Sequence, residues 1–575
     1  MLQASTGKLF TYPIGHSNLL RGVLYTNMDI VGHDEVDTVF GKILPLSMHR
    51  QPNVISCEIV ENIETMGDGP GVLHSNGIDI YLSDFADIVS FSLNVICTPD
   101  VNLASRLLSE QSRAGTTSPN KLLTRTFDKS VIIKQDDLDT LKEFTAELLG
   151  LSREKYLIAI KAIRTYVTAL HRLTEDLDLS YTLLVMSIEA LVQKFSDYQT
   201  QWSDVEAAKR NPIEVILKEL DADTSERLKT VIVKNEHLAL SKKFKHFILA
   251  NLPSNYFTDD AALQTHPIGR KDLDSALQNL YKTRSKYVHE LQALPKEFSH
   301  FAGPTETVII SGEMLLSFQG LTRLAKSVIR EFVSKQEKID KDPCDYNLEN
   351  PNLVRVKMCP STWVTNSSQL NKENCSIYFA GFVNLIDEFY NDYPNKKIYD
   401  MRSVIELGFS QKKQLKNQQR LSIFAMAVIF ESLVHPQYAP KITFSEQDLA
   451  QIDAPSIESL IAHAVLGIDT KWSVTEHEKE FDNYYQKRLK KSGFHLSHKL
   501  EACLGLALAE RYRVTGDHEN AQIKLNLTAE NFPSLKAVRE VATNYDPNMA
   551  INWIKIIYPK TIIAPPESNL ECVGL

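Results

Sequence analysis

The sequence lacks the cysteine pattern of a secreted or zinc-stapled protein. Its seven cysteines are odd in number and scattered, and no two of them form a C-x-x-C pair. This argues against a disulfide framework and against a structural zinc site. We therefore expect a reducing compartment, the cytoplasm, and we expect neither a metal ion nor another cofactor.

A basic leader and a long apolar run are also missing. Met1–Gly7 has no basic start followed by an apolar stretch, so it does not resemble a signal peptide. The longest apolar run is Leu421–Val434, which Glu431 interrupts. Because about 20 residues are needed to cross a bilayer, we expect no membrane partner and interpret this run as a buried core helix.

The chain has no excess of positive charge. Its formal net charge is -9, whereas a nucleic-acid-binding domain is usually strongly basic. Any contact with RNA must therefore rest on a local basic site. The phosphate-loop pattern G-x-x-x-x-G-K-[ST] and the nucleophile elbow G-x-S-x-G are absent as well.

What is present is enough chain for several domains. With 575 residues, two to four domains are expected. Apolar residues make up 43% and charged residues 23%, which is typical of globular proteins. We predict an α+β, mostly α fold: a β-rich N-terminal domain over 1–115, a helical bundle over 125–335, and an α-helical accessory domain over 353–575.

Short β-branched segments separated by turn residues predict the β-rich domain. The expected strands are Lys8–Pro13, Gly22–Tyr25, Val54–Val60, Ile78–Tyr81 and Ile88–Ile96. Turn signals stand at Gly67–Gly71, whose G-x-G we interpret as a plain turn, and at Asn76-Gly77. We interpret Ser109–Asn120 as a linker.

Periodic apolar positions and cap residues predict helices from about residue 135 onward. The expected helices are Asp136–Leu149, Ser152–Thr174, Leu177–Phe195, Lys271–Leu291 and Thr307–Ser334, with weaker ones over 213–250. Near the C-terminus, Leu504–Asp517 and Glu519–Ala521 together resemble one helix–turn–helix unit of a tetratricopeptide-like repeat. No second copy follows at a fixed period, so a solenoid stays one option for the accessory domain.

The helix expected over Lys271–Leu291 carries an arginine on its apolar side. The apolar stripe consists of Leu273, Leu277, Leu280, Tyr287, Val288 and Leu291. Arg284 falls near the centre of that stripe. An arginine facing a core is costly unless it is paired or lines a polar cavity. Two interpretations stay open: an internal salt bridge, with Glu189 as a candidate partner, or a phosphate-binding catalytic arginine.

His289 follows five residues later and completes an R-x4-H motif. On a straight helix the side chains of Arg284 and His289 point about 140° apart. A site built from both therefore needs a helix distortion, a long reach by the arginine, or a second subunit. The motif alone is weak, because Arg513 and His518 form another match, which we interpret as accidental.

The residues around the motif carry more information. Leu280–His289, which reads Leu-Tyr-Lys-Thr-Arg-Ser-Lys-Tyr-Val-His, resembles the motif helix of HEPN domains, in particular the Apea-like branch. Ser180–Leu191 resembles that family's apolar helix ending in Glu-Ala-Leu. The resemblance covers roughly residues 125–335. Ser285 departs from the family pattern, since many active members carry Asn, Asp or His after the arginine.

The resemblance implies a helical bundle that forms a homodimer, with two R-x4-H motifs facing each other across a cleft. It implies a metal-independent endoribonuclease in which the 2′-hydroxyl of RNA attacks the adjacent phosphate. It also implies prokaryotic anti-phage (abortive infection) defence, set off by a phage-derived trigger. Arg284 and His289 are then the catalytic pair, because histidine moves protons near neutral pH and arginine binds phosphate oxygens. Lys282 and Lys286 add local positive charge.

Other interpretations compete with this one. The bundle can instead be a non-catalytic dimerisation or ligand-binding scaffold in an interaction or sensor protein. Elsewhere, His495 and His498 form H-x-x-H, and a basic run extends from Lys412 to Arg420. We interpret both as solvated surfaces rather than as a metal site and an RNA contact.

Overall fold

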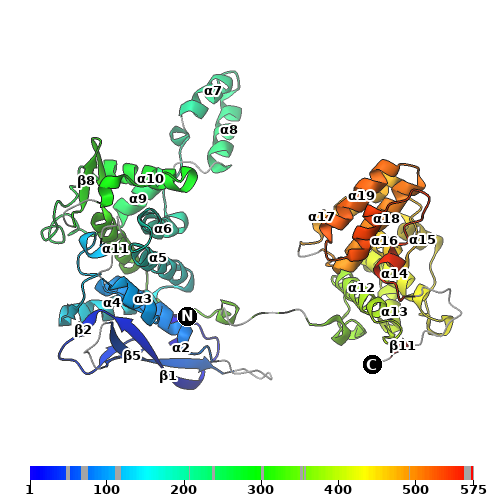
Figure 1. The fold of residues 1–575 in the computed structure, drawn as a ribbon, viewed down its shortest axis with the longest axis horizontal. Helices are drawn as coiled ribbons and strands as arrows, with labels where there is room; N and C mark the ends of the chain where they lie inside the picture. The colour runs from blue at the N-terminus through cyan, green and yellow to red at the C-terminus, as the bar shows by residue number, and fades with distance from the viewer. Residues whose placement is uncertain are drawn as a thin grey trace. The chain divides into compact units, whose positions relative to one another are not determined.

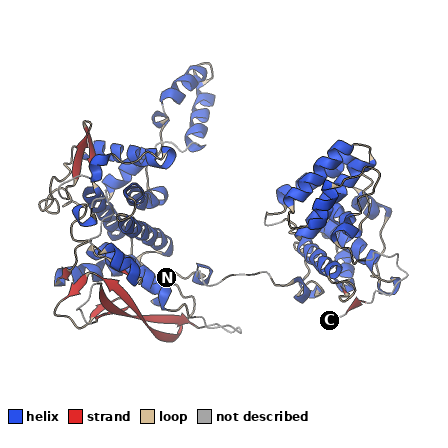
Figure 2. Ribbon diagram, in the orientation of Figure 1, coloured by secondary structure: helices blue, strands red, loops and turns tan. Residues whose placement is uncertain are grey.

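The computed structural model divides the chain into two compact units, Met1–Val354 and Arg355–Leu575. It describes residues 1–46, 52–65, 75–109, 118–205, 207–235, 240–299, 304–349, 354, 356, 358–490, 493–561 and 572–573. Figure 1 traces the elements, and Figure 2 separates helices from strands. The predicted α+β, mostly α class is confirmed. The predicted turn Gly67–Gly71 and residues 110–117 of the predicted linker lie outside the described residues.

A small sheet near the N-terminus forms one edge of the first unit (Figure 2). Its strand order is β3-β4-β5-β1-β6, and the two long strands β1 and β5 are antiparallel. The strands are β1 (Ile14–Thr26), β3 (Val36–Thr38), β4 (Gly41–Pro45), β5 (Asn53–Glu64) and β6 (Cys97–Thr98). Burial alternates along β5, because one face of the sheet packs against helices. A separate pair joins β2 (Met28–Ile30) to β7 (Val131–Ile133) in parallel.

Three of the predicted strands are wrong. Ile78–Tyr81 and most of Ile88–Ile96 belong to one helix, α2 (Ile78–Leu93), and Lys8–Pro13 forms turns. Helix α2 packs between the sheet and α5, and its side chains are buried along most of its length. Within these two segments, apolar residues alternate with Asp79, Ser90 and Ser92, and this local period of 2 resembles that of a strand. Contacts with the sheet and α5, rather than β-branched propensity, decide the conformation of α2.

The helices of the first unit pack on α2 and on one another. They are α1 (Leu2–Ser5), α3 (Val101–Leu107), α4 (Gln135–Gly150), α5 (Arg153–Arg172), α6 (Leu177–Phe195), α7 (Ala207–Leu217), α8 (Ala222–Asn235), α9 (Leu240–Ala250), α10 (Leu273–Glu290) and α11 (Phe318–Lys335). One continuous hydrophobic core runs from the sheet through α2 into α5, α6 and α11. The predicted β-rich region and the predicted bundle therefore share a core within Met1–Val354.

The segment Thr307–Ser334, predicted as one helix, begins with a β-hairpin. Strands β8 (Thr307–Ile310) and β9 (Glu313–Leu316) pair antiparallel, and α11 starts only at Phe318. Ser311 and Gly312, between the strands, have φ values of 50° and 80°. Positive φ at both central residues is what a tight two-residue hairpin turn requires, so Ser-Gly between two apolar segments was the missed signal.

The second unit is helical apart from one short strand pair. Its helices are α12 (Cys375–Asn391), α13 (Arg402–Ser410), α14 (Asn417–Leu433), α15 (Glu446–Asp453), α16 (Ile457–Leu466), α17 (Val474–Lys487), α18 (His498–Val514), α19 (His518–Asn531), α20 (Lys536–Thr543) and α21 (Trp553–Ile557). The strands are β10 (Ile398–Tyr399) and β11 (Cys572–Val573). Helix α14 is buried in the core, as predicted for Leu421–Val434. Among the described residues, no helix combines the length and the apolar character that a membrane crossing requires.

Candidate functional site

Arg284 on α10 reaches across to α6. Its Nη2 donates a hydrogen bond to Oε2 of Glu189 over 2.7 Å. The two side chains are only 17% and 12% exposed, so the ion pair lies largely out of solvent. The pair joins the two helices on which the family resemblance rests, and it places a permanent positive charge at the edge of the core.

The Glu189 carboxylate and the Arg284 guanidinium differ in how well their polar atoms are provided with partners. Burial raises the pKa of Glu189, and the nearby Arg284 opposes that shift. Burial also raises the pKa of Tyr281, one turn before Arg284, with Glu189 adding to the effect. The Nε of Arg284 is buried and has no hydrogen-bond partner among the described residues. Buried donors are normally paired, so this Nε is left unsatisfied within the described part of the chain.

His289 lies in the last turn of α10 and is exposed. The helix runs without a break from Leu273 to Glu290, and it ends at Leu291 with φ 52°. No helix distortion therefore turns His289 toward Arg284, and the two side chains stay on different sides of α10. Within one chain the structure does not bring the predicted pair together.

The apolar stripe of α10 leaves the core at Arg284. Before this residue, Leu273, Leu277 and Leu280 are at most 1% exposed. After it, Val288 and Leu291 are 42% and 79% exposed. The prediction of one buried stripe is therefore wrong for its last turn, because no other described element covers the end of the helix. The result is an apolar surface that begins beside the arginine.

The flanking lysines differ in their partners. Lys282 pairs with Glu313 of β9 at 3.2 Å, and both side chains are about half exposed. Lys286 has no ion pair within the described part of the chain. The positive charge next to the motif is therefore partly neutralised by the hairpin, and Lys286 keeps its charge available.

Comparison with known proteins adds no assignment. No family model, no curated protein and no solved structure matches this chain. Function must therefore be inferred from the chemistry of the residues themselves.

The second R-x4-H match is fully engaged in structure. Nε and Nη2 of Arg513 both bond to Glu510 over 2.7 Å, and Nη1 donates to the carbonyl of Pro547 over 3.0 Å. His518 starts the next helix, α19, beyond a turn at Gly516. Arg513 thus has its guanidinium satisfied on both edges, whereas Arg284 keeps an unpartnered Nε.

The remaining sequence candidates lie apart from this site in the chain. His495 and His498 are exposed, and the ring of His498 lies 5.9 Å from that of Phe532. Among the described residues, no group of three or more His, Cys, Asp or Glu side chains is arranged to hold a metal ion. At the start of the basic run, Lys412 pairs with Asp448 at 2.6 Å.

A second polar cluster, not predicted from the sequence, lies on α11. Arg323, Lys326 and Arg330 line a cavity of about 780 Å³ in the first unit. Their spacing of three and four residues places them on one helical face, and this spacing is visible in the sequence. Only the tertiary structure shows that the face looks into a cavity rather than into solvent.

Proposed function

We propose that this protein is a HEPN-type endoribonuclease whose active site is completed by a second copy of the chain. The observation that supports this proposal is the position of Arg284. Glu189 binds it where the apolar stripe of α10 passes from buried to exposed residues. Exposed apolar residues beside a largely buried cation are typical of an interface. Packing of two α10 ends against each other would cover Val288 and Leu291 and would place the partner's His289 near Arg284.

The chemistry of such a composite site follows from its side chains. The 2′-oxygen of RNA forms a bond to the adjacent phosphorus while the bond from phosphorus to the 5′-oxygen breaks. His289 takes the proton of the 2′-hydroxyl or supplies one to the 5′-oxygen. Arg284 donates to the phosphate oxygens as negative charge builds on them. The products are a 2′,3′-cyclic phosphate and a 5′-hydroxyl, and no metal ion takes part in the proposed steps.

The proposed setting is abortive anti-phage defence in the cytoplasm of a prokaryote. In this proposal a phage-derived trigger releases RNA cleavage, and the N-terminal sheet region and the second unit act as sensor or regulator. The acidic net charge of -9 supports this restraint, because it disfavours binding to RNA outside the local basic site.

Cleavage of total RNA in EDTA tests the proposal. The wild type is compared with Arg284→Gln and His289→Ala, and with His495→Ala as a matched exposed-histidine control, each with and without lysate of phage-infected cells. Wild type and His495→Ala should leave 2′,3′-cyclic ends, and the two motif variants should not. Equal RNA integrity for wild type and His289→Ala in every condition refutes the nuclease proposal.

Mixing the two inactive variants tests the composite site. If each site takes Arg284 from one chain and His289 from the other, a heterodimer of Arg284→Gln with His289→Ala keeps one intact site. Random pairing makes half of the dimers mixed, each with one of its two sites, so about a quarter of the wild-type rate should return. No recovery in a mixture that has exchanged subunits contradicts sharing of the site between chains.

A second candidate is a non-catalytic dimerisation scaffold. It is favoured by the engagement of Arg284 with Glu189 and by the separation of His289 on another side of α10. In that case the exposed end of α10 still pairs two chains, but no variant or condition produces cyclic-phosphate ends. The same RNA assay, together with the oligomeric state, therefore separates the two candidates.

A further inference from the structure

A cavity lies beside α11 in the first unit. Helices α4, α5 and α11 line it, together with residues of the loop 253–264. Asn94 and Thr124, from segments before the bundle, complete the wall. A volume of about 780 Å³ is typical of small-molecule sites.

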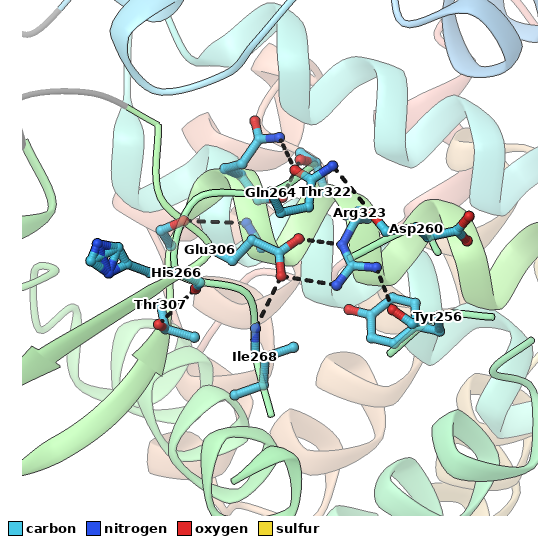
Figure 3. A network of polar contacts seen from close by, with 12 residues as sticks. Tyr256, Asp260, Gln264, His266, Ile268, Glu306, Thr307, Thr322 and Arg323 are labelled. Atoms are coloured by element: carbon cyan, nitrogen blue, oxygen red, sulfur yellow. Dashed lines mark hydrogen bonds and ion pairs between the residues drawn. The ribbon is translucent and has the colours of Figure 1, made fainter. Parts of the chain in front are cut away.

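Arg323 lines one wall of the cavity, and neighbouring groups already bind its guanidinium. Figure 3 shows its guanidinium between the carboxylate of Glu306 and the ring of Tyr256. Nη2 donates to Glu306 over 2.9 Å, Nε donates to the same carboxylate, and Nη1 donates to the carbonyl of Tyr256 over 2.9 Å. The backbone N–H of Ile268 also donates a hydrogen bond to the Glu306 carboxylate. Arg323 is therefore a structural cation.

Lys326 and Arg330 make no such direct ion pair with a described residue. Nζ of Lys326 donates to the carbonyl of Ser92 over 2.9 Å and to Oδ1 of Asn94 over 2.8 Å, and both acceptors are neutral. An ammonium has three donors, so one is left. Arg330 makes no hydrogen bond or ion pair with a described residue, and its guanidinium carbon lies 5.8 Å from the ring centre of Phe144.

Burial disfavours the charged forms of both Lys326 and Arg330. Burial lowers the pKa of Lys326 well below its usual value, and the neighbouring cation Arg330 lowers it further. Burial also lowers the pKa of Arg330, and the carboxylates of Glu147, Asp260 and Glu143 oppose that shift in part. Desolvated cations without a paired anion are costly, and an anion placed between them removes much of that cost.

The lining also carries negative charge, most of it opposite α11. Glu143 and Glu147 of α4, and Asp259 and Asp260 of the loop, line the cavity, together with Glu331 of α11. These carboxylates weaken the binding of a simple anion, whereas they accept hydrogen bonds from hydroxyl and amine groups. A ligand that suits both walls therefore has a phosphate at one end and hydrogen-bond donors at the other. The buried ring of Phe144 adds an apolar surface between them.

We propose that this cavity binds a phosphate-bearing small molecule of nucleotide size, with the phosphate between Lys326 and Arg330. The sugar hydroxyls or amine groups of the ligand face the acidic wall. This site is separate from the Arg284 site, and its occupancy does not depend on ribonuclease activity.

Calorimetric titration of the full-length protein with pyrophosphate tests the phosphate position. Pyrophosphate should bind the wild type at one saturable site. Arg330→Gln should weaken binding by about tenfold or more, which is the value of one charge-assisted hydrogen bond. Arg227→Gln makes the same charge change on α8, where the side chain is 80% exposed, and should leave affinity unchanged within about twofold.

A variant that is expected to tighten binding distinguishes loss of the site from loss of folding. Glu147→Gln removes a carboxylate that faces Arg330, so it should tighten pyrophosphate binding. ADP should displace pyrophosphate. Absence of saturable binding to the wild type, equal affinity of Arg330→Gln and Arg227→Gln, or weaker binding by Glu147→Gln overturns the site. Failure of ADP to compete overturns the proposed ligand size. Because every readout is binding, loss of the ribonuclease proposal leaves this result unaffected.

Discussion

Removing either partner of the Arg284–Glu189 pair should have unequal costs. The bond is 2.7 Å long, and the side chains are 17% and 12% exposed. In Arg284→Gln, the abandoned Glu189 can take up a proton, and burial already favours its protonated form by raising its pKa. In Glu189→Gln, the abandoned guanidinium cannot lose its charge, and its Nε already lacks a partner.

The magnitudes follow from this asymmetry. Breaking a fully buried pair by removing one partner costs about 3–5 kcal/mol, and residual solvent contact reduces this. We expect Glu189→Gln to lower the free energy of unfolding by about 2–3 kcal/mol, and Arg284→Gln to lower it by about 1 kcal/mol less at pH 5. Loss of Arg284 raises the pKa of Glu189 further, so the folded state binds the proton more tightly than the unfolded chain. Stability of Arg284→Gln should therefore fall as pH rises from the ordinary pKa of glutamate through the raised one.

Hydrogen exchange of α6 and α10 peptides at increasing urea, at pH 5 and pH 8, measures these differences within the first unit. Lys282→Gln is the matched control, because it breaks an exposed pair on the same helix and should cost at most about 0.5 kcal/mol. Equal costs for Arg284→Gln and Glu189→Gln at pH 5, or a larger cost for Arg284→Gln, would refute the reasoning.

Three further perturbations test other parts of the structure. Glu458 is 5% exposed and its pKa is raised by burial from 4.5 to about 7, so the folded second unit holds this proton more tightly and should lose about 3 kcal/mol of stability between those pH values. Glu458→Gln should remove that loss, as measured by tryptophan fluorescence during urea unfolding, and an unchanged pH slope contradicts the assignment. Leu291→Ser should weaken dimerisation about tenfold in sedimentation without lowering the melting temperature, because the side chain is 79% exposed; an unchanged dimer excludes this surface. Gly505→Ala should destabilise the second unit by about 1–3 kcal/mol, because the added Cβ would lie 2.4 Å from Oγ1 of Thr528 across the α18–α19 contact. Thr528→Ala should partly rescue it in the same unfolding assay, and an additive loss contradicts the contact.

Local sequence signals were sufficient for several elements. Leu177–Phe195 was predicted with the bounds that α6 has, because an apolar stripe runs along it; in the structure, Asp176 caps its first turn. The same kind of signal located α10 within two residues at its start and one at its end. Where apolar residues alternate locally with Asp or Ser, as in parts of α2, strand propensity led to the wrong element.

Local sequence signals predicted only part of the candidate site. An arginine on an apolar stripe indicated a partner, and Glu189 was a reasonable candidate for it. The exposure of Val288 and Leu291 was not predictable, because it depends on which elements cover the last turn of α10. The unbroken helix also removed one way of joining Arg284 to His289, which leaves the second chain as the basis of the proposed site.

The sequence by itself determined the mostly helical class, the long amphipathic helices and the unusual place of Arg284, because these depend on spacing and side-chain chemistry along a few turns. Only the tertiary structure decided which cations are neutralised. Arg323 and Arg330 stand seven residues apart on one face of α11, yet Glu306 is paired with the first and no described residue is paired with the second. Glu306 lies outside α11, on the other side of the β8–β9 hairpin, and a contact of that kind leaves no periodic trace in the sequence.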